Sequence, residues 1–263
     1  MSEETFFTQI DERGVATLTM NRPELHNAFD DVMIVELTTE LKRLKDEPQV
    51  RVVLLAASGR SFSAGADLNW MRRMADYSPE QNLADANGLA ELMRTLDTLP
   101  KPTIALVQGA AYGGGVGLAA CCDITIATAR ASFCLSEVRL GLIPAVISPY
   151  VVAAIGSRAA RRYFLTAEAF DAAEALRLGL VQEVVADQDE MTVVAERLTT
   201  QILKNGPAAL TAAKNLLRRV SHGAIDDGMI ADTADRIAGI RATVEGKEGL
   251  AAFLEKRLPA WIK

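Results

Sequence analysis

Three consecutive glycines, Gly113-Gly114-Gly115, are the residues whose types and spacing most suggest chemistry. They follow the apolar run Thr103 to Val107 and precede a helix-compatible run from Val116 to Cys122, which predicts a strand, a tight turn and a helix. Glycine allows a backbone to approach a ligand closely, and the first amides of a helix have no partner within it. Such a turn can therefore stabilise an anion, or an oxygen that becomes one during a reaction.

A single carboxylate, Glu137, follows later in the chain and is flanked by apolar residues. Together with the amides of the glycine turn, it indicates proton transfer beside a polarised carbonyl group. Ser58 to Asp67, a loop of small residues after a predicted strand, is a second place where backbone amides could face a ligand. Taken singly, these features are more typical of tight packing, a solvated side chain and an ordinary connection, so only their combination points to a site.

The composition is that of a globular protein without a basic surface. Of 263 residues, 49% are apolar and 24% are charged, which allows one large domain, or one domain with a helical appendage. The net charge of −6 does not indicate a basic surface that would bind nucleic acid. No apolar run is long enough to cross a membrane. The acidic start, Met1 to Glu4, has no basic region typical of a signal peptide.

The cysteines and histidines exclude several kinds of catalytic site. Cys121, Cys122 and Cys134 form neither a CxxC motif nor an even disulfide set, which indicates reduced thiols and a cytoplasmic location. His26 and His222 are the only histidines, so neither a histidine-based metal site nor a Ser-His-Asp triad is expected. The glycine-rich motifs of dinucleotide and nucleoside triphosphate sites are absent.

Hydrophobic periodicity and turn residues predict alternating strands and helices as far as about residue 150, and mainly helices after that. The alternation favours an α/β fold with parallel strands, and the apolar C-terminal helices suggest packing on a partner. The predicted strands are Phe6 to Ile10, Val15 to Met20, Val50 to Ala56, Thr103 to Val107, Asp123 to Ala127, Ser132 to Leu135 and Val181 to Val185. The predicted helices start at Asp30, Leu68, Pro79, Val116, Ser148, Ala169, Met191, Pro207 and Ala224, with Ser78 and Ser148 as N-caps and the ninth ending near Thr243.

Motifs along nearly the whole chain resemble those of the crotonase superfamily, the enoyl-CoA hydratase/isomerase group. One such motif would be weak, whereas all of them in order are specific. They are Asn21-Arg22-Pro23 with Asn27-Ala28, Ser63 to Leu68, Gly109 with Gly113 to Gly115, Cys122-Asp123-Ile124, Ser136-Glu137-Val138, Gly141 to Pro144, Glu174 to Val181, and Phe253 to Arg257.

The resemblance implies an architecture and a ligand. The fold would be a crotonase-type spiral of repeated ββα units over residues 1–200, followed by a C-terminal helical trimerisation region over residues 201–263. The protein would form a homotrimer or a dimer of trimers. The substrate would be an acyl-coenzyme A thioester, with coenzyme A as part of the substrate and no permanently bound cofactor.

The resemblance also implies roles for individual residues. Ala66 and Gly114 would donate their amides to the thioester oxygen, and Glu137 would transfer protons. Coenzyme A would be bound by Ala28, Ala64, Asp67 and Leu68, and, on a neighbouring subunit, by Phe253 and Lys256. The acyl pocket would be lined by Trp70, Tyr112, Gly117, Pro144 and Ala145. Trp70, Met71 and Met74 lie on neighbouring helix faces, and such a stripe usually belongs to a core, although it could also line an apolar pocket.

Two positions depart from the pattern of typical hydratases in this superfamily. Gly117 stands where they have the first of two glutamates, and Ala145 to Pro149 replace a Gly-Ala-Gly-Gly-Thr stretch. A water on the Ala145 amide, another side chain, or a carboxylate of the substrate could replace the missing group. A wall of Val138, Ile143 and Val146 is expected to desolvate Glu137 and raise its pKa.

A longer string, Cys134 to Pro149 with Ala154-Ile155-Gly156, is similar to bacterial methylglutaconyl-CoA hydratases of leucine breakdown and to isohexenylglutaconyl-CoA hydratases. It favours hydration of a branched or carboxylated 2-enoyl-CoA such as 3-methylglutaconyl-CoA. Because of Gly117, a Δ3-Δ2 enoyl-CoA isomerase with one glutamate stays an alternative. A thioester hydrolase or another enolate chemistry on this scaffold is a second alternative, and a binding or RNA-associated protein is a third. Arg72, Arg73 and Arg139 are candidate partners for a tail carboxylate, although a solvated face is the simpler interpretation.

Overall fold

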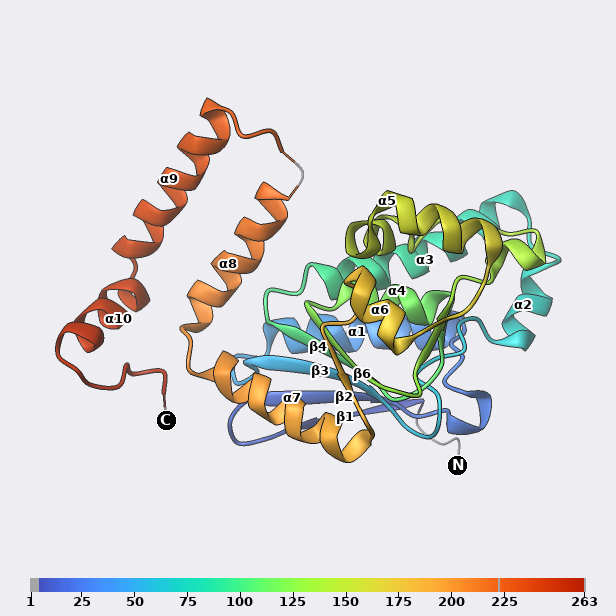
Figure 1. Ribbon diagram of the computed structural model, residues 1–263, viewed down its shortest axis with the longest axis horizontal. Coiled ribbons are helices and arrows are strands. Elements are labelled where there is room, and N and C mark those ends of the chain that lie inside the picture. Colours follow the sequence, from blue (N-terminus) through green and yellow to red (C-terminus); the bar gives the residue numbers. More distant parts are fainter. Residues whose placement is uncertain (1–4, 222, 263) are drawn as a thin grey trace.

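A twisted six-stranded sheet forms the centre of the computed structural model, which describes residues 5–221 and 223–262 (Figure 1). The strands lie in the order β1-β2-β3-β4-β6-β9. β1 and β2 form the predicted antiparallel hairpin, and the remaining pairs are parallel. The bounds are β1 Phe6–Ile10, β2 Val15–Met20, β3 Val52–Ala57, β4 Thr103–Val107, β6 Ile124–Thr128 and β9 Glu183–Val185. The mixed α/β fold with a parallel sheet is as predicted.

A second, three-stranded sheet carries the glycine turn. It contains β5 (Ala111–Tyr112), β7 (Ser132–Cys134) and β8 (Phe170–Asp171), with β7 in the middle. Because β5 follows β4 directly in the chain, the backbone leaves the large sheet for the small one just before the three glycines. The turn is thus fixed between two sheets rather than standing on a free loop.

Helices cover both faces of the large sheet (Figure 1). One face packs against a core of apolar residues from α1, α3, α4 and α5. The other face, with Val52, Ile104 and Ile126, packs against Met191 and Ala195 of α7. The bounds are α1 Asp31–Asp46, α2 Leu68–Met74, α3 Pro79–Asp97, α4 Gly114–Cys121, α5 Ser148–Thr166, α6 Ala172–Leu178 and α7 Gln188–Leu203, with short 3-10 turns η1 Pro23–Leu25 and η2 Glu137–Leu140.

Several helix starts are those that the sequence predicts. The Asp30 carboxylate accepts the amide of Met33 at 2.9 Å, so it caps α1. Ser78 and Gln81 form a reciprocal capping box at the start of α3, with Pro79 in its first turn. These caps define where α1 and α3 begin.

The last three helices, α8 (Pro207–Val220), α9 (Asp227–Ala242) and α10 (Val244–Leu254), project away from the sheet as an arm (Figure 1). Lys214 of α8 fastens the arm to the core, because its Nζ donates to Oδ2 of Asp123 at 2.7 Å. Within the arm, Glu245 of α10 accepts the amides of Ala208 and Ala209 at 2.9 and 2.8 Å. This carboxylate caps α8, whose own N-cap, Gly206, has no side chain.

Three predictions about helices are wrong. Ile147, not Ser148, is the N-cap of α5; the Ser148 hydroxyl instead donates to the carbonyl of Ala145 at 2.7 Å. The sixth long helical stretch begins at Ala172 rather than Ala169, because Phe170–Asp171 pair with β7 as a strand. The sequence interpretation also omitted α10. No helix in the described part of the chain is long and apolar enough to span a membrane.

Candidate active site

Backbone hydrogen bonds hold the loop before α2 against the glycine turn. The amide of Tyr112 donates to the carbonyl of Ser63 at 2.9 Å, and the amide of Phe29 donates to the carbonyl of Gly65 at 2.9 Å. A Cβ on Gly65 would lie 3.7 Å from the amide nitrogen of Gly114. The two predicted amide-presenting segments therefore meet in the folded chain.

Two backbone amides are left without acceptors where these segments meet. Gly114 is the first residue of α4, so its amide has no partner within the helix. Across the hydrogen bonds of the described residues, neither the Gly114 amide nor the Ala66 amide donates to a protein acceptor. A thioester oxygen that gains negative charge is the type of acceptor that such a pair stabilises.

Phe29 supports this arrangement, and the sequence interpretation did not single it out. It forms a parallel bridge with Ala66, and its ring lies under Gly114, where an added Cβ would be 2.2 Å from its Cζ. Residue 114 must therefore be glycine for steric reasons, because any side chain there would displace the Phe29 ring. The position of Phe29 directly after the Asn27-Ala28 motif was the available signal.

Glu137 lies beside the same turn, at the start of η2. A Cβ on Gly113 would be 3.2 Å from its Oε1, and its Oε2 is buried with no hydrogen-bond partner in the described chain. Burial raises the pKa of this carboxyl, as predicted, and no neighbouring charged side chain contributes to the shift. A partly desolvated carboxylate is a stronger base than an exposed one, which suits it for proton transfer.

The predicted surroundings of Glu137 are partly wrong. The Ala145 amide is not available to hold a water, because it donates to the carbonyl of Ile143 at 2.8 Å across the tight turn at Pro144. Ile143 is 72% exposed, so it does not form an apolar wall beside Glu137. Val146 does pack against the main core.

The predicted pocket residues lie in different settings. Trp70 is 3% exposed and donates its indole N–H to Asp85 at 2.9 Å, so within one chain it is a core residue. Tyr112 directly precedes the glycine triplet, and its carbonyl would be 2.9 Å from a Cβ on Gly65. Pro144 is buried and Ala145 exposed. Gly117 lies one turn into α4, close to Ile147.

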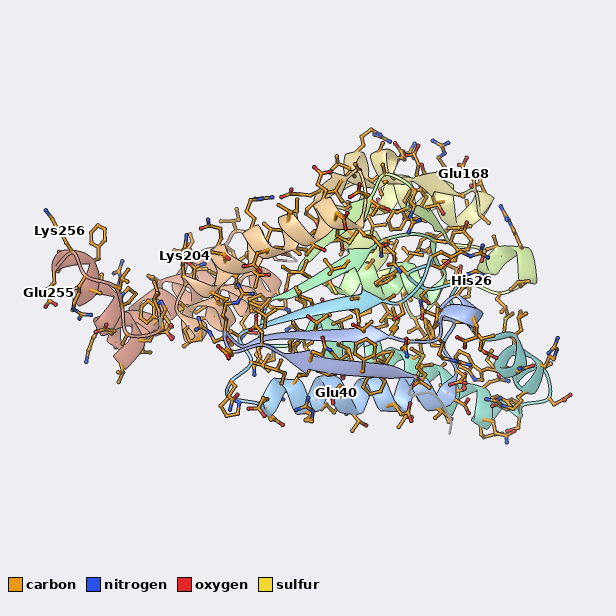
Figure 2. The ribbon with its side chains drawn as sticks, turned by 90° about the horizontal axis from the view of Figure 1, so that it is seen from below. His26, Glu40, Glu168, Lys204, Glu255 and Lys256 are labelled. Carbon is orange, nitrogen blue, oxygen red and sulfur yellow. The ribbon has the colours of Figure 1, made fainter. Side chains whose placement is uncertain are left out.

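The predicted coenzyme A contacts fall into two groups. Ala28, Ala64, Asp67 and Leu68 all lie around the loop that carries the Ala66 amide; Ala64 and Leu68 are exposed. The carboxylate of Asp67 already has partners within the chain, because it caps α2 and accepts a hydrogen bond from Arg22 at 3.1 Å. Lys256 lies at the opposite end of the molecule from His26, as Figure 2 shows, and Phe253 is on the same arm. The arm therefore does not reach its own chain's site.

The three candidate arginines differ in their partners. Arg73 pairs with Asp31, and Arg72 donates to the side chain of Asn69 at 2.6 Å. Arg139, in η2 with Glu137, donates to the carbonyl of Ala167 at 2.6 Å and has no carboxylate partner in the described part of the structure. Nowhere in that part do three or more His, Cys, Asp or Glu side chains form a group that could hold a metal ion.

The sequence profile of the enoyl-CoA hydratase/isomerase family matches residues 11–263. The chain belongs to this family. It is therefore an enzyme of the enoyl-CoA hydratase type, a hydro-lyase family, and the predicted resemblance to the crotonase superfamily is confirmed.

Relatives of this enoyl-CoA hydratase/isomerase family member support the assignment over the whole chain. A crystal structure of an enoyl-CoA hydratase from Shewanella pealeana superimposes with a TM-score of 0.95 at 52% identity, covering 98% of this chain and 96% of that one. A 2,3-dehydroadipyl-CoA hydratase of Escherichia coli is 33% identical over 94% of this chain and 95% of its own. A crotonyl-CoA hydratase of Syntrophomonas wolfei is 33% identical over 94% of both.

Proposed function

We propose that this enzyme hydrates the 2,3 double bond of a branched or carboxylated acyl-CoA thioester of the 3-methylglutaconyl-CoA type. The observation that carries the proposal is one half-buried carboxyl, Glu137, beside two unpaired amides, that of Gly114 in the glycine turn and that of Ala66 in the loop packed against it. Water supplies the oxygen that bonds to C3 and a proton that ends on C2. The electrons of the double bond move onto the thioester oxygen and return when C2 takes the proton.

Ala66 and Gly114 stabilise the enolate in this mechanism, because both amides donate to the oxygen on which charge accumulates. Glu137, as the carboxylate, accepts a proton from water as the water oxygen attacks C3. It then delivers that proton to C2, so it ends each turnover in the form in which it began. One carboxyl group therefore suffices for the balance of atoms and charge.

A carboxylate on the substrate is our choice for the group that replaces the missing glutamate. The Ala145 amide is already used within the chain, and no charged side chain influences the pKa of Glu137. Arg139, which has no carboxylate partner in the part of the chain that the structure describes, would bind the tail of such a substrate. The E. coli relative is named for a substrate with a second carboxyl group, 2,3-dehydroadipyl-CoA.

A panel of acyl-CoA esters tests this proposal. 2-Enoyl-CoA and 3-enoyl-CoA esters, each with and without a tail carboxylate, are incubated with the enzyme and analysed by mass spectrometry. We expect a gain of one water, fastest with a carboxylated 2-enoyl ester, and a smaller preference for it in Arg139→Ala. A shifted double bond without a mass change would instead establish the isomerase, and release of free coenzyme A would establish a hydrolase.

We further propose that residues 1–200 form the catalytic core and that residues 201–263 form a trimerisation region. Exposed apolar side chains on the arm support this, with Ile225, Val244 and Phe253 exposed by 90, 88 and 80%. In a homotrimer or a dimer of trimers, Phe253 and Lys256 would contact coenzyme A on a neighbouring subunit. Light scattering of the purified protein measures the number of subunits, and a monomer would contradict this assembly.

We also place the enzyme in the cytoplasm, in leucine breakdown. The free cysteines support the location, and the similarity to methylglutaconyl-CoA hydratases supports the pathway. A strain that lacks the enzyme should accumulate the unhydrated acyl-CoA when it grows on leucine. Normal growth on leucine, with no such accumulation, would contradict the assignment to this pathway.

A further inference from the structure

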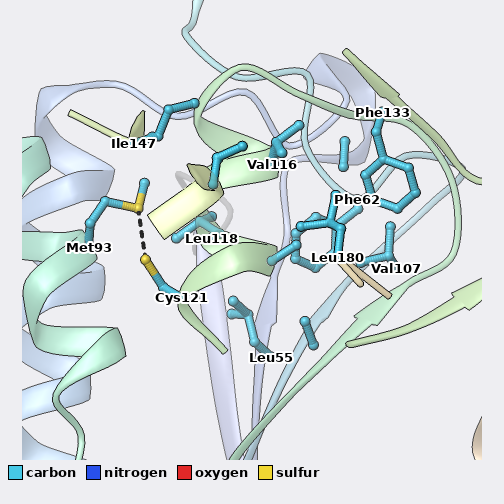
Figure 3. Packing of buried hydrophobic residues seen from close by; sticks show 14 of the residues in the cluster. Leu55, Phe62, Met93, Val107, Val116, Leu118, Cys121, Phe133, Ile147 and Leu180 are labelled. Carbon is cyan, nitrogen blue, oxygen red and sulfur yellow. Dashed lines mark hydrogen bonds between the residues drawn. The ribbon is translucent and has the colours of Figure 1, made fainter. Parts of the chain in front are cut away.

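Ile147 and Met93 fill the space beside Gly117. A Cβ added to Gly117 would lie 2.3 Å from Cγ2 and 2.9 Å from Cβ of Ile147, and 3.2 Å from Cε of Met93. Contacts below 3.0 Å are not found for real Cβ atoms, so no side chain can stand at residue 117 unless Ile147 moves. Figure 3 shows Ile147 and Met93 facing the helix α4 from two different segments.

This filled space lies one turn of α4 away from Glu137. The amide of Gly117 donates to the carbonyl of Gly113, the N-cap of α4, at 3.3 Å, so the two residues are one turn apart. Glu137 touches the Gly113 position, and Ile147 touches the Gly117 position. Ile147 therefore occupies the place one helical turn, about 5.4 Å, beyond the glutamate contact.

Ile147 is held rigidly there. It is 2% exposed, Met93 is fully buried, and both belong to the main core. The Ile147 carbonyl accepts the amide of Val151 at 3.1 Å, which fixes the residue to the first turn of α5. Met93 is restrained from the other side, where the Cys121 thiol donates to its sulfur at 3.7 Å (Figure 3).

We infer that Ile147, seated against Met93, is a specificity-determining residue that closes the acyl site beside Gly117 and so limits the size of the substituent at C3. The inference rests on the proposed function for its substrate class. Its geometric basis is independent of the reaction, because the clash at Gly117 exists whichever acyl group binds. Stability and selectivity can therefore be tested separately.

The geometry is tested by a double-mutant cycle of thermal unfolding. Gly117→Ala alone should lower the unfolding temperature by roughly 5–10 °C, because its methyl group overlaps Ile147. In the Ile147→Ala variant, the same Gly117→Ala change should lower the unfolding temperature by less than half as much, because the overlapping atoms of Ile147 are gone. Equal losses in the two backgrounds would show that Ile147 does not close this space, and would overturn the inference.

The selectivity is tested with 2-enoyl-CoA esters that differ only in the substituent at C3, methyl or propyl. Ile147→Ala should raise the ratio of kcat/KM for propyl over methyl by on the order of tenfold. Ile155→Ala is the matched control: Ile155 is also a buried isoleucine of α5 in the same core, two turns away. It should destabilise the protein without changing the ratio.

The outcomes separate the two proposals. If the unaltered enzyme hydrates none of the esters, the proposed function fails, while the unfolding cycle still decides whether Ile147 fills the space. If the unaltered enzyme hydrates them but Ile147→Ala changes the ratio by less than twofold, or changes it no more than Ile155→Ala does, Ile147 does not determine specificity.

Discussion

Replacing Glu137 with glutamine should nearly abolish turnover while leaving the fold intact. The substitution keeps the size of the side chain and removes only its ability to exchange a proton. General acid–base catalysis by one positioned group typically contributes about 10²–10⁴-fold. Oε2 of Glu137 has no hydrogen-bond partner in the described part of the chain, so no side chain bonded to it there can take over the proton. We therefore expect a loss of about 10³–10⁴-fold in kcat, or about 4–5.5 kcal/mol of transition-state stabilisation.

The same substitution should change how the protein responds to pH. The pKa of Glu137 is raised by burial in the folded protein, so between the unfolded and folded pKa values only the folded state retains the proton. Stability therefore falls as pH rises from about 4.3, the ordinary value of a glutamic acid, through the folded pKa. Glu137→Gln lacks this loss. The acid limb of kcat/KM in the unaltered enzyme should likewise lie above pH 4.3.

Glu40→Gln is the matched control for both measurements. The hydrogen bond from Arg43 lowers the pKa of Glu40, so this carboxylate stabilises the fold above its unfolded pKa, and that stability is lost as pH falls through its folded pKa. The control should retain full activity. Relative to the unaltered protein, Glu40→Gln should become less stable as pH rises, whereas Glu137→Gln should become more stable. Hydration is followed by loss of the enoyl-thioester absorbance, and unfolding by urea at several pH values. A Glu137→Gln protein that is folded and keeps more than a tenth of the activity would refute the assignment.

Three further predictions follow from the same contacts. Gly114→Ala should lower both activity and unfolding temperature, because its Cβ would be 2.2 Å from the Phe29 ring. Adding Phe29→Leu to this variant should restore part of the lost stability. No recovery in the double variant would show that the ring is not the obstacle. Lys214→Ala should lower the free energy of unfolding in urea by about 3 kcal/mol, because it leaves Asp123 without its buried ion-pair partner. A loss below about 1 kcal/mol would contradict the role of this pair in holding the arm against the core. Phe253→Ala should raise KM for an acyl-CoA ester but not for the matching pantetheine ester, because this side chain, 80% exposed in one chain, would contact coenzyme A on a neighbouring subunit. Equal effects on both esters would contradict a contact with the nucleotide part of coenzyme A.

Most of the elements that position the site could be predicted, because each depends on local sequence signals. Asp30 lies at the start of α1 and Ser78 caps α3, where each accepts a backbone amide, and the strand–glycine–helix order around Gly114 is as expected. The boundaries were wrong where a distant strand or a turn intervened. Phe170 looked helical by its neighbours, but β7 takes it into the small sheet.

The details of the site were less predictable, because they depend on contacts between distant segments. The Ala145 amide looked available in the sequence, yet the turn at Pro144 directs it onto the carbonyl of Ile143. Gly117 looked like a missing acid and proved to be a residue that Ile147, from a separate helix, leaves no room to replace. Spacing along one strand or helix cannot show such a contact, which appears only after α4 and α5 are packed together.

The start of α8 is capped by a residue that is synthesised much later than α8 itself. Glu245 binds the amides of Ala208 and Ala209 from 37 and 36 residues further along the chain, and a Cβ on Gly206 would be 2.4 Å from its Oε1. The first turn of α8 is therefore completed only after α10 has been made and has folded back. A nascent chain therefore cannot complete this end of the arm before Glu245 has left the ribosome.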